Sequence, residues 1–170
     1  MKPKPSKAVK APKAVSRAAR STIVPPVIKS ILVAIDFSDP SRKALIYAAS
    51  VAKVFKAKLT LLHVVEPVPA PDFSEAFPLA IENEQLMLTS KAQLETVLKD
   101  ARIPDSAVEK TLVRFGRSFN EIAAAARERK VDLIIIATHG YTGLKHVLLG
   151  STTERVVRHA SCPVLVLRQS

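Results

Sequence analysis

A segment near the C-terminus combines residue types that bind phosphate. Three of the four glycines of the chain lie within residues 140–150, and Ser151, Thr152 and Thr153 follow directly. Glycine lets a backbone approach a phosphate closely, and free amides and hydroxyls at a helix N-terminus favour an anion because the helix dipole is positive there. The segment therefore predicts a polyphosphate cradle at the start of a helix.

The same segment has a simpler interpretation. Ser151 followed by Glu154 is a capping box, and the glycines are also typical of turns that bind nothing. The spacing is neither that of a Walker A loop nor that of a GxGxxG fingerprint. On residue types alone, a ligand-free turn and a phosphate site have equal weight.

A second polar group, Asp36, ends the first β-branched run of the chain. A carboxylate after a strand often caps the following turn. Here Asp39, with Pro40 at the first helical position, is better placed to cap the next helix. We therefore expect the Asp36 carboxylate to be free for a ligand.

Short apolar runs alternating with helical patterns must position these groups. Such an alternation predicts an α/β fold with a single open, parallel sheet and helices on both faces. The five predicted strands are Ile31–Asp36, Leu59–Val65, Val108–Arg114, Leu133–Thr138 and Val164–Arg168. The third alternates, which is typical of an edge strand, whereas the others are nearly continuous, which is typical of strands covered on both faces.

Four helices are predicted between these strands. The first begins at Asp39, the second covers Leu79–Ala101, the third opens with a capping box of Ser118 and Glu121, and the last begins at Ser151 or Thr152. The inward stripe expected for the first helix is Ala44, Ala48, Val51, Ala52 and Phe55. In a sheet of order 3-2-1-4-5 the first and fourth strands flank the switch point, where ligands bind. Asp36 then lies opposite Gly140.

Composition divides the chain into a basic tail, residues 1–28, and a globular domain, residues 29–170. Residues 1–30 hold eight Lys or Arg, five prolines and no acidic residue, which leaves +3 of the net charge of +11 for the rest. We expect a mobile tail that makes salt-sensitive contacts with nucleic acid or another polyanion, or that solubilises or targets the protein. With one cysteine, Cys162, and no apolar run of about 20 residues, we expect a cytoplasmic protein without disulfide, zinc site or membrane span.

The chain from Ile31 to Arg168 resembles the ATP-binding class of universal stress proteins. The resemblance lies in Ala34-Ile35-Asp36-Phe37-Ser38, Leu62-His63-Val64, the turn at Gly116 and Cys162-Pro163-Val164-Leu165-Val166. The family's nucleotide motif is glycine, two residues, glycine, nine residues, then glycine followed by Ser or Thr. Gly140 and Gly150-Ser151 match it, but Ala137 stands at the first glycine. Alanine adds one methyl group and disfavours positive φ, so we expect a tighter pocket floor and weaker binding.

The resemblance implies a Rossmann-like fold of the adenine nucleotide alpha hydrolase type that binds ATP, AMP or ADP, with Mg²⁺ or Mn²⁺ held through the phosphates. It implies that adenine is surrounded by Ala34, Ile35, Asp36 and Val64. The ribose and α-phosphate would be lined by Ala137, His139 and Gly140, and the phosphates held by Gly150, Ser151, Thr152 and Thr153. It also implies a homodimer in which Val164–Arg168 pairs with its copy, covering an exposed edge.

These features predict a binding module in which nucleotide occupancy regulates contacts with partners during stress. No general base is evident at the γ-phosphate, so efficient hydrolysis is not predicted. His63, inside a strand, is expected to be a packed residue, and His139 to contact the ligand without catalysing a reaction. The alternatives are a slow ATPase or nucleotide-transfer enzyme on the same scaffold, and a polyanion-binding protein that acts through its basic tail.

Overall fold

The computed structural model describes residues 26–67, 76–138 and 149–168. Most of the predicted basic tail and the pair His139-Gly140 lie outside these residues. The elements in chain order are β1 (Ser30–Ala34), α1 (Asp39–Phe55), β2 (Lys58–Val65), α2 (Ala76–Asp100), a short 3₁₀ helix (Asp105–Ala107), β3 (Val108–Phe115), α3 (Ser118–Glu128), β4 (Leu133–Ala137), α4 (Ser151–His159) and β5 (Val164–Leu167). All five predicted strands and four predicted helices are present, with ends that differ by up to three residues.

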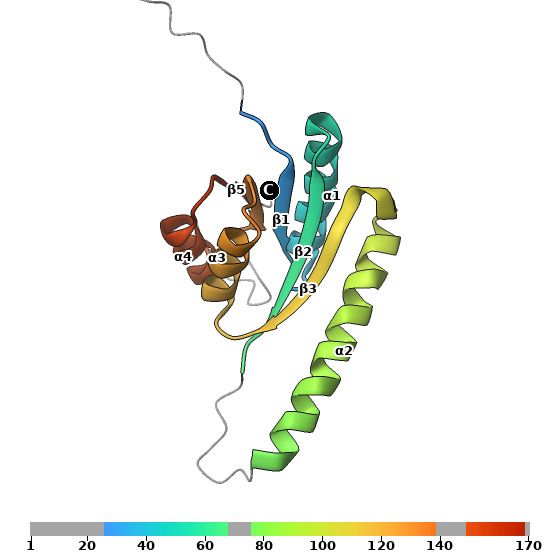
Figure 1. The fold of residues 1–170 in the computed structure, drawn as a ribbon, viewed down its shortest axis with the longest axis vertical. Coiled ribbons are helices and arrows are strands. Elements are labelled where there is room, and N and C mark those ends of the chain that lie inside the picture. Colours follow the sequence, from blue (N-terminus) through green and yellow to red (C-terminus); the bar gives the residue numbers. More distant parts are fainter. Residues whose placement is uncertain (1–25, 68–75, 139–148, 169–170) are drawn as a thin grey trace, which may run out of the picture.

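The five strands form one parallel sheet of order β3-β2-β1-β4-β5, which confirms the predicted topology. β1 pairs with β2 on one side and with β4 on the other. Strands β2 and β3 are therefore added on one side of β1, and β4 and β5 on the opposite side. Helices α1 and α2 cover one face and α3 and α4 the other (Figure 1). This arrangement places the carboxyl ends of β1 and β4 side by side, at the topological switch point.

Alternation along the central strands gives each face of the sheet its own core. Ile31 and Val33 of β1 pack with Leu45 of α1 on one face, whereas Leu32 packs with Ile122 of α3 on the other. Strands buried on both faces need apolar residues at every position, which explains the nearly continuous runs in the sequence. β3 lies at one edge, as its alternating pattern predicted, and β5 at the other, where its four residues are only half-buried.

Two details of α1 differ from the prediction. The N-cap is Ser38, whose hydroxyl accepts a hydrogen bond from the Ser41 amide, so Asp39 is the first helical residue and not the cap. Phe55 is 42% exposed, whereas Leu45 is fully buried. Phe55 is the last residue of the helix, where the chain turns away through Lys56 in the left-handed region, so the inward stripe ends one turn early.

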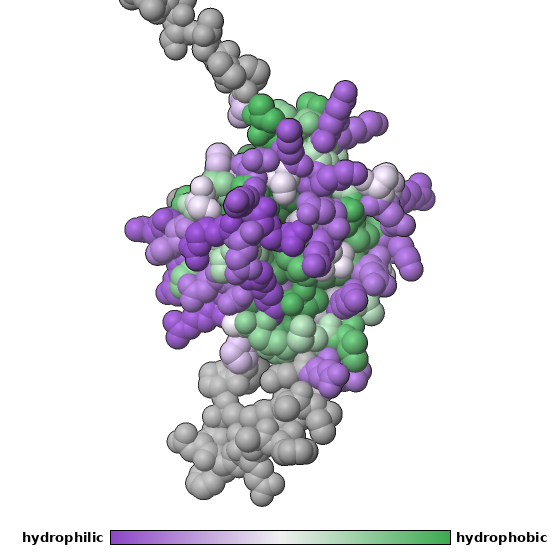
Figure 2. Space-filling model, viewed as in Figure 1, coloured by the Kyte–Doolittle hydropathy of each residue, from purple (hydrophilic) through white to green (hydrophobic). Residues whose placement is uncertain are grey.

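The outer surface is largely polar. Figure 2 shows hydrophilic side chains over most of one face, with smaller hydrophobic areas between them. Exposed apolar side chains include Ile46, Tyr47 and Val54 on α1 and Leu88 on α2. Across the described ranges, no helix is both long enough and apolar enough to cross a membrane.

One buried hydroxyl in β2 has no partner, and this leads to a stability prediction. The Thr60 Oγ1 is fully buried and makes no hydrogen bond in the part of the chain that the structure describes. Since an orphaned buried hydroxyl costs stability, we expect Thr60→Val, which keeps the side-chain shape, to raise the free energy of unfolding by about 1 kcal/mol in denaturant titrations. The control is Thr153→Val: its hydroxyl donates to the Ala137 carbonyl at 2.8 Å, so that change should destabilise. Equal losses of stability in Thr60→Val and Thr153→Val would contradict the assignment of the Thr60 hydroxyl as a buried group without a partner.

Candidate functional site

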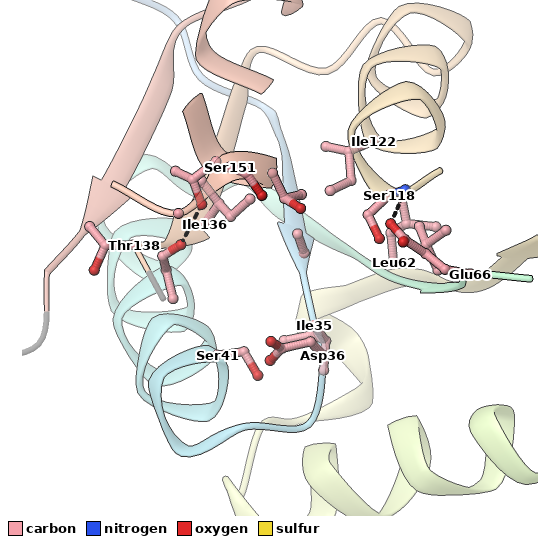
Figure 3. A pocket seen from close by; sticks show the side chains of 16 residues that line it. Ile35, Asp36, Ser41, Leu62, Glu66, Ser118, Ile122, Ile136, Thr138 and Ser151 are labelled. Carbon is pink, nitrogen blue, oxygen red and sulfur yellow. Dashed lines mark hydrogen bonds between the residues drawn. The ribbon is translucent and has the colours of Figure 1, made fainter. Parts of the chain in front are cut away.

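A pocket of about 310 Å³ opens at the switch point, beyond the carboxyl ends of β1, β2 and β4. The N-termini of α3 and α4 lie on its rim, and the loop after β1 forms another side (Figure 3). Nine of the eleven residues predicted from the sequence line it: Ala34, Ile35, Asp36, Val64, Ala137, Gly150, Ser151, Thr152 and Thr153. The other two, His139 and Gly140, lie outside the described residues.

The Asp36 carboxylate is held by the turn that follows it. Its Oδ1 accepts hydrogen bonds from the Ser38 amide, at 3.1 Å, and from the Ser38 hydroxyl. The expectation of a wholly free carboxylate was therefore wrong for one oxygen, because Ser38 serves both as helix cap and as donor to Asp36. Among the described residues, Oδ2 makes no hydrogen bond, so this second oxygen remains available at the pocket wall.

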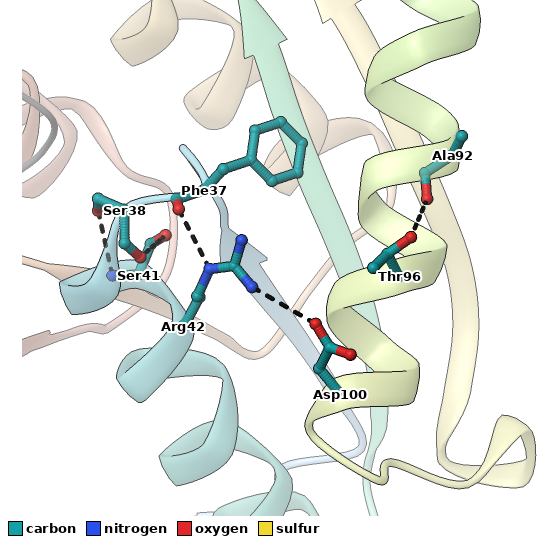
Figure 4. A network of polar contacts seen from close by, with 7 residues as sticks. All are labelled: Phe37, Ser38, Ser41, Arg42, Ala92, Thr96 and Asp100. Carbon is teal, nitrogen blue, oxygen red and sulfur yellow. Dashed lines mark hydrogen bonds and ion pairs between the residues drawn. The ribbon is translucent and has the colours of Figure 1, made fainter.

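Contacts of Phe37 hold the turn that follows Asp36 in place. The Phe37 φ of 64° is in the left-handed region, which is costly for an aromatic residue, and three contacts hold it there. Its carbonyl accepts a hydrogen bond from Arg42 Nε at 3.2 Å, and Arg42 pairs with Asp100 of α2 at 3.7 Å (Figure 4). The centroid of the Phe37 ring lies 4.4 Å from that of the His63 ring. The Asp36 carboxylate is thus presented from a fixed backbone.

His63 has the packed role expected from the sequence. Its Nδ1 lies 2.8 Å from the Ile35 carbonyl oxygen, and its ring supports Phe37. The contact joins the ends of β1 and β2 beneath the Asp36 turn. His63 therefore stabilises the pocket wall from behind and is not among the residues that line the pocket.

The start of α4 is fitted closely against the end of β4. The Gly150 amide donates to the Thr138 carbonyl at 2.8 Å, and a Cβ added to Gly150 would lie 2.7 Å from that oxygen. The need for glycine here is therefore steric, since its φ of −65° suits any residue. Ala137 is an ordinary residue of β4 and does not need positive φ. The expected strain from alanine at this position of the family motif is absent.

No side chain in the part of the chain that the structure describes caps the N-terminus of α4. Gly150 is its N-cap residue, and Glu154, the second member of the suspected capping box, instead binds Arg158 at 2.7 Å. The interpretation of this segment as a capping box is therefore wrong. Free amides at the first turn carry the positive end of the helix dipole, and Ser151 and Thr152 add hydroxyls beside them at the pocket. This end of α4 has the chemistry of an anion site.

The N-terminus of α3 lacks the predicted capping box of Ser118 and Glu121. Ser118 is the first residue of the helix and not its cap, and its amide donates to Glu66 Oε1 at 2.7 Å. Glu121, the predicted partner in a capping box, instead lies 3.5 Å from Arg114 of β3. The Ser118 hydroxyl and amide, together with the nearby Arg117 charge, hold the pKa of Glu66 below its ordinary value of 4.5, although burial acts in the opposite direction.

The contact between Glu66 and Ser118 makes stability depend on pH. Because the folded-state pKa of Glu66 is lowered, its stabilising contribution is fully present above the ordinary value of 4.5 and is lost as the pH falls through the folded value. We expect Glu66→Gln to be less stable than the wild type near neutral pH, with the difference narrowing below about pH 4.5. Urea titrations at several pH values measure it. A difference that does not change with pH would contradict the assigned contact.

Sequence reasoning missed seven residues that line the pocket: Ser41, Leu62, Glu66, Ser118, Ile122, Ile136 and Thr138. Leu62, Ile122 and Ile136 looked like ordinary core residues, because the pocket is continuous with the core under α3. A signal did exist for Glu66. It directly follows the run that forms β2, and the ends of parallel strands meet at one edge of the sheet.

Comparison with known proteins assigns this chain to one family. Residues 28–168 match the model of the universal stress protein family. A universal stress protein of Methanocaldococcus jannaschii is 34% identical over 141 residues, which cover 83% of this chain and 82% of that protein. The solved universal stress protein UspA from Lactobacillus plantarum is 26% identical and superimposes with a TM-score of 0.72, covering 85% of this chain and all of that one.

Two other solved universal stress proteins share the fold and were determined with nucleotides. One is in complex with cAMP and is 22% identical, with a TM-score of 0.57 and coverage of 85% of this chain and 100% of that one. The other, from Archaeoglobus fulgidus, is in complex with dAMP and is 19% identical, with a TM-score of 0.55 and coverage of 83% and 98%. The match of nearly the whole described domain, in sequence and in fold, shows that this chain belongs to the universal stress protein family.

Proposed function

We propose that this universal stress protein binds ATP, or a related adenine nucleotide, in the switch-point pocket. The observation that carries the proposal is that one pocket holds two complementary groups. These are the N-terminus of α4, whose N-cap residue is Gly150, and the Asp36 carboxylate. The first suits phosphates, and the second accepts hydrogen bonds from the amino group of a base or from ribose hydroxyls. Apolar Val64 and Ile136 also line the pocket and suit a base.

Relatives with the same fold support this proposal. The cAMP and dAMP complexes were both formed by universal stress proteins, so the fold accommodates an adenine nucleotide in those two proteins. In this pocket we place the adenine at Asp36 and Val64, and the phosphates at Gly150, Ser151, Thr152 and Thr153.

A divalent ion fits this arrangement only as a companion of the nucleotide. Within the described ranges, no three His, Cys, Asp or Glu side chains gather into a metal site. Mg²⁺ commonly keeps several waters and binds through substrate phosphates. We propose that Mg²⁺ or Mn²⁺ accompanies ATP in this way, and that the nucleotide-bound protein acts in the cytoplasm as a regulatory module during stress.

Nucleotide content and affinity test the proposal. The purified protein is denatured, any released ligand is identified by mass, and Mg²⁺-ATP is titrated into the ligand-free protein by calorimetry. Copurified adenine nucleotide, or a dissociation constant in the micromolar range that rises in Asp36→Ala, supports the proposal. Absence of released nucleotide, together with weak binding that Asp36→Ala does not change, would refute it.

We also propose that β5 forms a homodimer by pairing with its copy. β5 is an edge strand of sequence Val164-Leu165-Val166-Leu167, and its half-buried apolar side chains are what a buried interface needs. We expect a dimer by light scattering, converted to a monomer by Val166→Pro, because proline removes a backbone donor at the edge. A wild-type monomer at all concentrations, or a Val166→Pro dimer, would contradict this.

A further inference from the structure

Two helix N-termini face the same pocket, and among the described residues a protein side chain closes only that of α3. At α3 the Ser118 amide donates to Glu66 Oε1 at 2.7 Å. At α4 the N-cap residue is Gly150, and no side chain in the described ranges caps the first turn. Figure 3 shows Glu66 and Ser118 on one side of the pocket and Ser151 on another. The pocket is therefore electrostatically asymmetric.

Both helix ends would attract anions if they were left open. α3 has 11 residues and α4 has nine, so each carries a developed dipole with its positive end toward the pocket. The carboxylate of Glu66 takes the place that a phosphate oxygen would take at the Ser118 amide. It also brings a negative charge that repels a further anion from this end.

Glu66 comes from a separate element, not from α3 itself. It follows β2 directly and reaches α3 across 52 positions of sequence, whereas Arg117, the N-cap residue of α3, makes no side-chain cap. The Ser118 contacts keep Glu66 ionised, because they lower the pKa of its carboxyl group. The Glu66 carboxylate beside the N-terminus of α3 is therefore negatively charged at neutral pH.

We propose that Glu66 is a specificity-determining residue that excludes anions from the α3 end of the pocket, so that the phosphates of a bound nucleotide enter only at α4. This inference rests on the proposed nucleotide function and gives it a direction. The ligand class that fits is one with a single anionic arm, placed at α4, and uncharged hydrogen-bond donors toward Glu66 and Asp36. A nucleotide with phosphates at two ends, such as adenosine 3′,5′-bisphosphate, is disfavoured.

Backbone amide signals in an NMR titration with inorganic phosphate test the exclusion. In the wild type we expect the signals of Ser151–Thr153 to shift, and that of Ser118 to remain in place. In Glu66→Ala the Ser118 signal should shift as well, because its amide and the helix dipole become available. The matched control is Glu121→Ala, which removes a carboxylate from the first turn of the same helix and should behave like the wild type.

A wild-type Ser118 signal that shifts at the same phosphate concentration as those of α4 would overturn the proposal. So would a Ser118 signal that stays in place in Glu66→Ala, since Glu66 would then be only a cap. Because inorganic phosphate has no base, these results are independent of nucleotide binding. A protein that binds no adenine nucleotide refutes the proposed function, whereas a Ser118 signal that phosphate leaves unchanged in Glu66→Ala refutes only the role of Glu66.

A comparison of the affinities for AMP and adenosine 3′,5′-bisphosphate tests the selectivity without the Glu66→Ala variant. We expect the wild type to bind AMP at least about tenfold more tightly than adenosine 3′,5′-bisphosphate, which corresponds to about 1.4 kcal/mol. Glu66→Gln keeps an acceptor for the Ser118 amide but removes the charge, so the ratio of the two affinities should fall severalfold. An unchanged ratio would overturn the assigned selectivity.

Discussion

Substitution of Gly150 by valine is expected to abolish nucleotide binding. A Cβ at this position meets the Thr138 carbonyl oxygen at 2.7 Å, and both groups belong to backbone that cannot rotate away. The first turn of α4 must therefore move, which breaks the hydrogen bond from the Gly150 amide to Thr138 and displaces the amides of Ser151 and Thr152. We expect a loss of at least about 100-fold in ATP affinity and about 1–3 kcal/mol in stability.

Two further variants distinguish local geometry from general damage. Gly150→Ala brings the same Cβ with less bulk, so it should weaken binding to an intermediate degree. Val157→Ala changes an exposed residue of the same helix, 47% accessible, and should leave affinity and stability unchanged. Calorimetry with Mg²⁺-ATP and thermal unfolding measure both quantities. Wild-type affinity in Gly150→Val would show that α4 does not hold the phosphates.

Substitution of Asp36 by alanine is expected to weaken ATP binding by about tenfold to hundredfold. One carboxylate oxygen is fixed by Ser38, and the other is left at the pocket wall to accept a hydrogen bond from the ligand. A hydrogen bond to a charged group contributes about 1.5–3 kcal/mol, which corresponds to this range. Asp36→Ala also releases Ser38, so a modest loss of stability should accompany the loss of affinity.

The matched control for this variant is Asp39→Ala. Asp39 is an exposed carboxylate three positions away, in the first turn of α1, and it does not line the pocket. It should bind ATP like the wild type. Equal losses in both variants would mean that overall charge near α1, and not the Asp36 oxygen, governs affinity.

Most of the fold was predictable because hydrophobic periodicity and chain order determine it. The nearly continuous apolar runs of β1, β2 and β4 mark buried parallel strands, and right-handed crossovers leave few strand orders to consider. The position of the site then follows from the switch point. This reasoning placed Asp36 and Gly150 at one pocket, although 113 residues separate them in the sequence.

Local capping was predicted less well, because several polar side chains compete for each helix end. Asp39, Ser118 and Ser151 all had suitable spacing for a cap, yet none of them is the N-cap residue of its helix. At α3 the amide of Ser118 is taken by Glu66, a residue remote in sequence. A capping box involves only residues close together in the sequence, so it cannot predict a partner such as Glu66 that is remote in the chain.

The role of Phe37 was also beyond sequence reasoning. An aromatic residue with positive φ is uncommon, and only the contacts with Arg42 and His63 make it tolerable. These contacts connect the Asp36 turn to β2 and, through Asp100, to α2. The position of the pocket wall therefore depends on tertiary contacts with β2 and α2, which local sequence patterns do not reveal.

A crystal structure of the protein with Mg²⁺-ATP tests the central claim most directly. The account predicts phosphate oxygens within about 3 Å of the backbone amides of Ser151–Thr153, with the adenine between Val64 and the Asp36 turn. It also predicts that Glu66 keeps its bond to Ser118 and touches no phosphate. A nucleotide bound elsewhere on the protein, or one with its phosphates against Ser118 and its base against α4, would contradict it.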